Sequence, residues 1–365
     1  MGFGVADGPP ASVRERERRE YADRSWRSAA PLRLSLAGGG SDLAGYSDTF
    51  GGAVINVTIG RYAYAHLRLL ENPVVVMEAC DAGIVETSDL GSEPPNTQLP
   101  LHWGVYRRVL HDFNDGVPFG THIRTFVDAP LGSGLGASSA LTVAIVEVFR
   151  AALELPLGRY DIAHLAYAIE RFDLGLPGGK QDQYASAFGG VNFIEFLPGD
   201  RVVVNPLRLN NAVLLDLQSS MVVCFSGQAR KSQEVINEQV SALAEKHPDA
   251  IQKFHQLKDD AFAMKMALLR GDLREAGTIL DRSWLAKKGT AANVSNPLIE
   301  HLLEVAHKHG AFAGKISGAG GGGFIVFFAD PESKPTLMRS LDEAGGKSDS
   351  IVLSTGGVEA WRTSI

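Results

Sequence analysis

The sequence has few cysteines, no long uncharged hydrophobic run and little net charge, and each shortage excludes a class of protein. Cys80 and Cys224 are the only cysteines among 365 residues, and neither belongs to a CxxC or Cys/His cluster. We therefore expect no disulfide framework and a reducing, cytoplasmic location. No stretch reaches the roughly 18–20 apolar residues of a membrane span, and the first residues contain no apolar signal-peptide core. Membrane insertion and secretion are not expected.

The charge balance argues against a general attraction for nucleic acid or for an anionic membrane. The formal net charge is -7, with 21% charged residues, so an anionic ligand must meet local basic groups. Hydrophobic residues make up 45% of the chain, and its length exceeds the roughly 250–300 residues at which one core usually stops growing. The composition predicts a globular protein with two domains.

The pattern along the chain predicts an α+β fold. Residues 1–28 open with glycine and proline and continue with alternating Arg and Glu, with little to bury, which predicts a disordered or marginally helical arm. Residues 29–205 begin with strand-like runs, and residues 206–365 contain long helical stretches and a final strand, so we place the domain boundary near residue 205. The run AVLLDLQ (residues 212–218) is predicted to be a short strand.

Glycine is the residue in excess, with 40 of 365 positions, about 11% against about 7% in average proteins. Three clusters matter: the first glycine loop (residues 38–40), the central glycine loop (residues 130–140) and the third glycine loop (residues 318–323). The central loop, PLGSGLGASSA, leads into an apolar helix whose free N–H groups and dipole favour an anion. Its serines could ligate magnesium beside a phosphate or simply cap the helix.

The standard nucleotide motifs are missing. The central loop lacks the lysine of GxxxxGK[ST], its spacing is not GxGxxG, and the HRD and DFG sets of protein kinases are absent. The sequence therefore indicates a phosphate-binding loop of another kind.

Two acids twelve residues apart could supply the remaining chemistry of a phosphotransferase. Glu170 ends a predicted helix, and Asp182 follows the glycine pair 178–179. A kinase needs a magnesium carboxylate and usually a base for the attacking hydroxyl. The alternatives are that Glu170 is a solvated acid beside Arg171 and that Asp182 is a helix N-cap.

Three ordered segments resemble the motifs of the GHMP small-molecule kinases: APLRLSLAGGGSDL (residues 30–43), PLGSGLGASSA (residues 130–140) and KISGAGGGGF (residues 315–324). Within that family, GGGSD, GLPGGKQDQYASAFGGVNFIEF and WLAKKGTAANVSNPLIE are most similar to the D-glycero-D-manno-heptose 7-phosphate kinases. The resemblance implies a two-domain α+β fold, with an N-terminal domain like ribosomal protein S5 domain 2, a ferredoxin-like C-terminal domain and the active site between them.

The resemblance also implies roles for individual residues. Ser139 and Glu170 would ligate Mg²⁺, Asp182 would act as base or orient the hydroxyl, and Arg33 would stabilise the transferred charge. The implied ATP-phosphate contacts are Gly132, Ser133, Gly134, Leu135, Gly136, Ala137, Ser138 and Ser139, and the implied sugar contacts are Gly40, Ser41 and Asp42. In the third glycine loop, the residues Gly318 to Gly322 would pack beneath the central loop.

The expected activity is ATP-dependent phosphorylation of the anomeric hydroxyl of D-glycero-D-manno-heptose 7-phosphate, giving the 1,7-bisphosphate for nucleotide-activated heptose synthesis. A phosphate on the substrate needs its own cation site, for which Arg230, Lys231, Lys287 and Lys288 are candidates, solvated helix charges being the alternative. Two other functions remain open: a kinase for an unphosphorylated sugar such as L-fucose, and a catalytically silent sugar-binding relative. The expected partners are a sugar phosphate and ATP, without nucleic acid or membrane, and a homodimer is one possible assembly.

Overall fold

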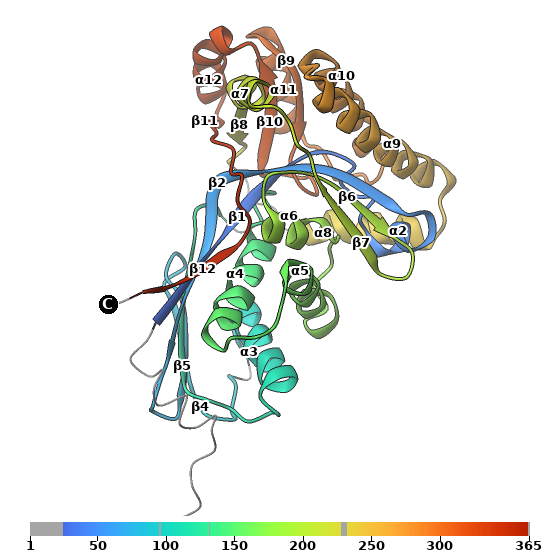
Figure 1. Ribbon diagram of the computed structural model, residues 1–365. Coiled ribbons are helices and arrows are strands. Elements are labelled where there is room, and N and C mark those ends of the chain that lie inside the picture. Colours follow the sequence, from blue (N-terminus) through green and yellow to red (C-terminus); the bar gives the residue numbers. More distant parts are fainter. Residues whose placement is uncertain (1–24, 95, 131, 228–231, 364–365) are drawn as a thin grey trace, which may run out of the picture.

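The computed structural model describes residues 25–94, 96–130, 132–227 and 232–363, which form two β-sheets with helices packed on them (Figure 1). The larger sheet has eight strands, in the order β12-β1-β2-β5-β3-β4, with β6 and β7 branching from β2. Its strands are β1 (Ser25–Ala37), β2 (Gly52–Leu69), β3 (Val74–Ala79), β4 (Ile84–Asp89), β5 (Thr121–Val127), β6 (Val191–Leu197), β7 (Arg201–Pro206) and β12 (Glu359–Thr363).

The smaller sheet is antiparallel and confirms the ferredoxin-like prediction. Its four strands are β8 (Met221–Phe225), β9 (Ala311–Ile316), β10 (Phe324–Ala329) and β11 (Lys347–Ser350). They lie in the order β11-β8-β10-β9, and helices connect β8 to β9 and β10 to β11, as in the β-α-β-β-α-β unit.

Several helices cover one face of the larger sheet, a long helix from the second half of the chain packs against its strands β1 and β2, and others surround the smaller sheet (Figure 1). Those associated with the larger sheet are α2 (Ala44–Phe50), α3 (Pro100–Phe113), α4 (Ala137–Ala152), α5 (Arg159–Ala168), the π-helix η1 (Ile169–Asp173) and α6 (Gln181–Phe188). The remainder are α7 (Asn211–Ser220), α8 (Ser232–Ala244), α9 (Pro248–Arg270), α10 (Leu273–Lys288), α11 (Pro297–Lys308), the short 3₁₀ turn η2 (Pro331–Ser333) and α12 (Lys334–Glu343). No described helix is both long and apolar enough to span a bilayer.

Strand β2 links the parts of the larger sheet. It pairs with β1 along most of its length, while its first half pairs with β6 and its second half with β5. The apolar helix α4 packs across β1 and β2, and the buried Ser28 hydroxyl donates to Ala144 O at 2.6 Å. This packing places the end of β1 and the start of α4, which carry two of the glycine loops, at the centre of the molecule.

Three segments differ from the sequence predictions. Ser25 to Ser28, placed in the predicted arm, belong to β1 because Trp26 is buried and the segment pairs with both β2 and β12; residues 1–24 lie outside the described residues. β12, assigned to the second domain, returns to the edge of the first sheet. The predicted strand 212–218 is helix α7, whose first turn is capped by the Asn210 side chain accepting from Val213 N at 2.9 Å.

Candidate active site

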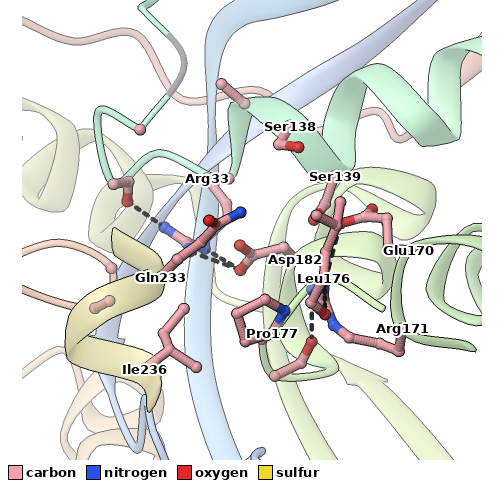
Figure 2. Close-up of a pocket in the computed structure, with 18 residues that line it drawn as sticks. Arg33, Ser138, Ser139, Glu170, Arg171, Leu176, Pro177, Asp182, Gln233 and Ile236 are labelled. Carbon is pink, nitrogen blue, oxygen red and sulfur yellow. Dashed lines mark hydrogen bonds and ion pairs between the residues drawn. The ribbon is translucent and has the colours of Figure 1, made fainter. Parts of the chain in front are cut away.

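A cavity of about 390 Å³ opens where the central and third glycine loops meet (Figure 2). Its walls come from β1, α4, η1, the loop before α6, α6 itself and α8. The lining residues are Arg33, Gly132, Gly134, Gly136, Ala137, Ser138, Ser139, Glu170, Arg171, Leu176, Pro177, Gly178, Gly179, Asp182, Gln233, Ile236, Gly318 and Ala319.

The central glycine loop turns the start of helix α4 toward this cavity. Gly132, Gly134 and Gly136 have φ values of 76°, 83° and 72°, a region that favours glycine. Gly136 is the N-cap of α4, and no side chain caps that helix, so its first N–H groups remain available for an anion. Of the implied phosphate contacts, Ser133 and Leu135 are buried and do not line the cavity, whereas the other six do.

The third glycine loop packs directly against the central loop. The Ser317 hydroxyl donates to Gly134 O at 3.0 Å, and a Cβ built on Gly318 would lie 2.7 Å from the Gly134 Cα. This close approach leaves no room for a side chain.

Replacing Gly318 by Ala should therefore distort the central loop. We expect it to destabilise the fold by about 1–3 kcal/mol, as overpacking does, and to raise KM for ATP. Gly345→Ala is the matched control, because Gly345 has a similar φ of 93° but nothing lies within 4 Å of its added Cβ. Thermal unfolding and ATP kinetics of both variants test this, and equal effects in the two would contradict the packing argument.

Ser139 and Glu170 form a buried oxygen pair at one wall. The Ser139 hydroxyl donates to Glu170 Oε2 at 3.0 Å, and Gln183 Nε2 donates to Glu170 Oε1 at 3.1 Å. Burial raises the pKa of Glu170, an effect that the nearby Arg171 charge opposes. Glu170 is 2% exposed and sits on the π-helix η1, so the alternative of a solvated acid does not describe it.

This oxygen pair fits a magnesium ion that also binds phosphate oxygens. No cluster of three His, Cys, Asp or Glu side chains suited to a metal occurs within the part of the chain that the structure describes. Mg²⁺ characteristically takes one or two protein oxygens and completes its octahedron with water and substrate phosphates. Ser139 and Glu170 would supply those two.

Arg33 and Asp182 form an ion pair at the floor of the cavity (Figure 2). Asp182 Oδ1 accepts from Arg33 Nε at 2.8 Å and lies 2.6 Å from Nη2, while Arg33 Nη1 donates to Gly134 O at 2.6 Å. Asp182 stands in the first turn of α6, but its carboxylate is directed to Arg33 and not to the helix backbone. The ion pair therefore links β1, α6 and the central glycine loop.

A second compartment of about 60 Å³ lies beyond this ion pair, and both compartments include Arg33 and Asp182 in their walls. Asp42 lines the second compartment, and its carboxylate accepts from Gly40 N at 2.8 Å and from Gln181 Nε2 at 3.1 Å. Lys287 also lines it and donates to Gly39 O at 3.0 Å. Burial lowers the pKa of Lys287 to about 8, although the Asp42 charge acts in the opposite direction.

Gly40 also lines the second compartment, whereas Ser41 and Lys288 line neither compartment. The Ser41 hydroxyl is engaged by the backbone of Ala53, donating to its carbonyl at 2.9 Å. Lys288 faces the other side of α10, where it pairs with Glu300 at 3.2 Å. Arg230 and Lys231 lie outside the described residues.

Several lining residues were not predicted from the sequence. Arg171 donates to Leu176 O at 3.1 Å and to Gly179 O at 3.3 Å, and so holds the loop before α6 against the cavity. Gln233 and Ile236 reach the cavity from α8. The position of Arg171 next to Glu170 in the sequence could have indicated that Arg171 lies at the site. Nothing in the sequence of α8 indicates that Gln233 and Ile236 reach the cavity.

Comparisons with known proteins identify the family of this chain. The GHMP kinases N-terminal domain family matches residues 100–190, and the GHMP kinases C-terminal family matches residues 264–347. A D-glycero-alpha-D-manno-heptose 7-phosphate kinase of Campylobacter jejuni is 39% identical over 92% of this chain and 98% of its own. A bifunctional fucokinase/GDP-fucose pyrophosphorylase of Arabidopsis thaliana is 27% identical over 89% of this chain and 32% of its own.

A solved structure named as a D-glycero-D-manno-heptose 1-phosphate kinase, from Bacteroides thetaiotaomicron, superposes with a TM-score of 0.79. It is 38% identical and covers 93% of this chain and 100% of its own. The chain belongs to the GHMP kinase family, and its similarity to the heptose 7-phosphate kinase over nearly the whole chain shows an ATP-dependent sugar kinase. Among the described relatives, the heptose phosphate kinases are more similar to it than the fucokinases are.

Proposed function

We propose that the protein phosphorylates the anomeric hydroxyl of D-glycero-D-manno-heptose 7-phosphate with ATP, in the synthesis of nucleotide-activated heptose. The observation that carries this proposal is the pair of compartments joined at Arg33 and Asp182. One compartment ends at a glycine loop and helix N-terminus suited to phosphates, and the other contains Asp42 and Lys287. The transferred phosphoryl group would cross at their junction.

Each group at the junction has a chemical task. The central loop and the start of α4 bind the ATP phosphates, and Mg²⁺ held by Ser139 and Glu170 would neutralise their charge. Asp182 accepts or orients the hydroxyl proton, while the Arg33 guanidinium stabilises charge that develops on the transferred group. An anomeric hydroxyl is more acidic than an ordinary alcohol, so a weakly basic carboxylate suffices.

Lys287 is the candidate for recognising the anionic substrate from within the second compartment. Lys287→Met removes the charge while keeping most of the volume, so we expect KM for the sugar phosphate to rise at least tenfold with KM for ATP little changed. Lys288→Met is the matched control, because Lys288 lies outside the cavity. Initial rates with each substrate varied in turn test this, and equal changes in both KM values would remove Lys287 from substrate recognition.

A substrate panel tests the proposed function itself. ADP release should be fast with the heptose 7-phosphate and slow with heptose 1-phosphate, mannose, L-fucose and galactose. Heptose 1-phosphate belongs in the panel because one heptose kinase relative is named for the 7-phosphate and the other for the 1-phosphate. Preference for an unphosphorylated sugar would contradict the proposal, and binding of sugars without any ADP release would indicate a catalytically silent relative.

A further inference from the structure

A second large cavity lies on the face of the eight-stranded sheet opposite α3 to α6. In Figure 1, α9 covers part of that face, where it packs against β1 and β2, and the part beside β5 carries no helix. The cavity there measures about 370 Å³, within the range usual for small-molecule sites. Its side walls are formed mainly by basic and aromatic residues, namely Arg27, Tyr64, His66, Arg124, Phe126 and Trp361.

Three basic side chains form a row across neighbouring strands. Arg27 on β1 is paired in register with His66 on β2, which is paired in turn with Arg124 on β5. Within the described chain, no hydrogen bond or ion pair involves the Arg27 guanidinium. Arg124 Nε lies 2.9 Å from Oε2 of Glu78, whose carboxylate faces this row from β3.

His66 adds an unpaired nitrogen to this row. Its Nε2 is buried without a hydrogen-bond partner among the described residues. Burial lowers the pKa of His66, and the charges of Arg27 and Arg124 lower it further. A buried polar atom without a partner favours a ligand that supplies one, and the Arg27 guanidinium, which no carboxylate of the described residues pairs with, favours a ligand that is anionic.

Aromatic side chains flank the basic row. Tyr64 and Phe126 are stacked, with ring centroids 6.4 Å apart, and Trp361 is paired in register with Arg27 from β12. Phe126 is 45% exposed and Trp361 is 44% exposed, so each presents ring surface to solvent. Aromatic rings beside arginines bind flat ring systems such as nucleobases by stacking.

We propose that this cavity binds a nucleoside phosphate, with its base against Trp361, Tyr64 or Phe126 and its phosphate against Arg27 and His66. The net charge of the whole chain is -7, so this basic row is a local feature and not part of a general positive surface. The site is separate from the kinase cavity, with which it shares no lining residue, and it does not depend on the proposed function.

Calorimetric titration of the full chain with GMP, without any competing nucleotide, tests the proposal. GMP should bind, and Arg27→Ser and Trp361→Ala should each weaken that binding at least tenfold. Arg339→Ser is the matched control, because Arg339 is an exposed arginine on α12, remote from this face. All three variants should retain wild-type kinase activity.

The proposal would be overturned by an absence of GMP binding at 10 mM, by binding that neither variant weakens, or by inorganic phosphate binding as tightly as GMP. Equal affinity for inorganic phosphate would mean that the aromatic rings do not contribute to recognition. Loss of GMP binding in the control as well would also contradict the assignment to this cavity.

Discussion

Asp182→Asn should lower kcat by about 10²–10⁴-fold while leaving ATP affinity nearly unchanged. The substitution preserves the shape of the side chain and one acceptor for Arg33, but it removes the basic oxygen at the junction of the two compartments. Steady-state kinetics give kcat, and calorimetric titration with ADP and Mg²⁺ shows whether the nucleotide compartment survives.

Asp216→Asn provides the control for this experiment, because Asp216 is an exposed aspartate on α7, outside both compartments. It should behave as wild type. If Asp182→Asn retained full kcat, Asp182 would have no part in proton transfer or in orienting the hydroxyl, and the account of the junction would be wrong.

Glu170→Gln should produce the second large effect, a loss of at least about a hundredfold in activity at low Mg²⁺. Changes to residues that only support a metal ligand typically lower metal affinity or activity by about 10–100-fold, so loss of a ligand itself should exceed that range. Excess Mg²⁺ should restore activity only in part. Activity measured against Mg²⁺ concentration, with Mn²⁺ as a second metal, tests this expectation.

Thermal unfolding provides a readout of Glu170 that does not depend on activity. The pKa of Glu170 is raised by burial, so ionisation of this group opposes folding, and stability falls as pH rises from the ordinary value of 4.5 through the raised one. Glu170→Gln should therefore be at least as stable as wild type at pH 8 without ligands, and the difference should shrink toward pH 5. Mg²⁺ with ADP should raise Tm more for wild type than for the variant. If Glu170→Gln were less stable than wild type at pH 8 without ligands, the role assigned to burial would be wrong.

The predictable parts of the fold were those with strong local signals. Gly132 to Gly136 followed by an apolar run indicated a loop and helix α4, because glycine φ and helix period are short-range properties. The run 212–218 was misassigned because a short apolar segment has no decisive period, and because Asn210 was not recognised as the cap at which helix α7 begins. The return of β12 to β1 depends on pairing between residues more than 300 positions apart, which no local pattern encodes.

The same distinction applies to the candidate site. Ser139, Glu170, Asp182 and Arg33 could be proposed from motifs, and the structure brings them to one cavity. Lys287 and Lys288 could not be separated from the sequence, because neighbours on a helix point in different directions and only packing shows which one faces inward. Ser41 was grouped with Asp42, but its hydroxyl is taken by the backbone of β2.

Phosphorus NMR of the product formed from D-glycero-D-manno-heptose 7-phosphate and MgATP tests the central claim most directly. A second phosphate resonance, coupled to the anomeric proton, should appear in proportion to ADP, with the 7-phosphate signal retained. A new phosphate coupled to any other sugar proton, or no product while an unphosphorylated sugar is converted, would contradict it.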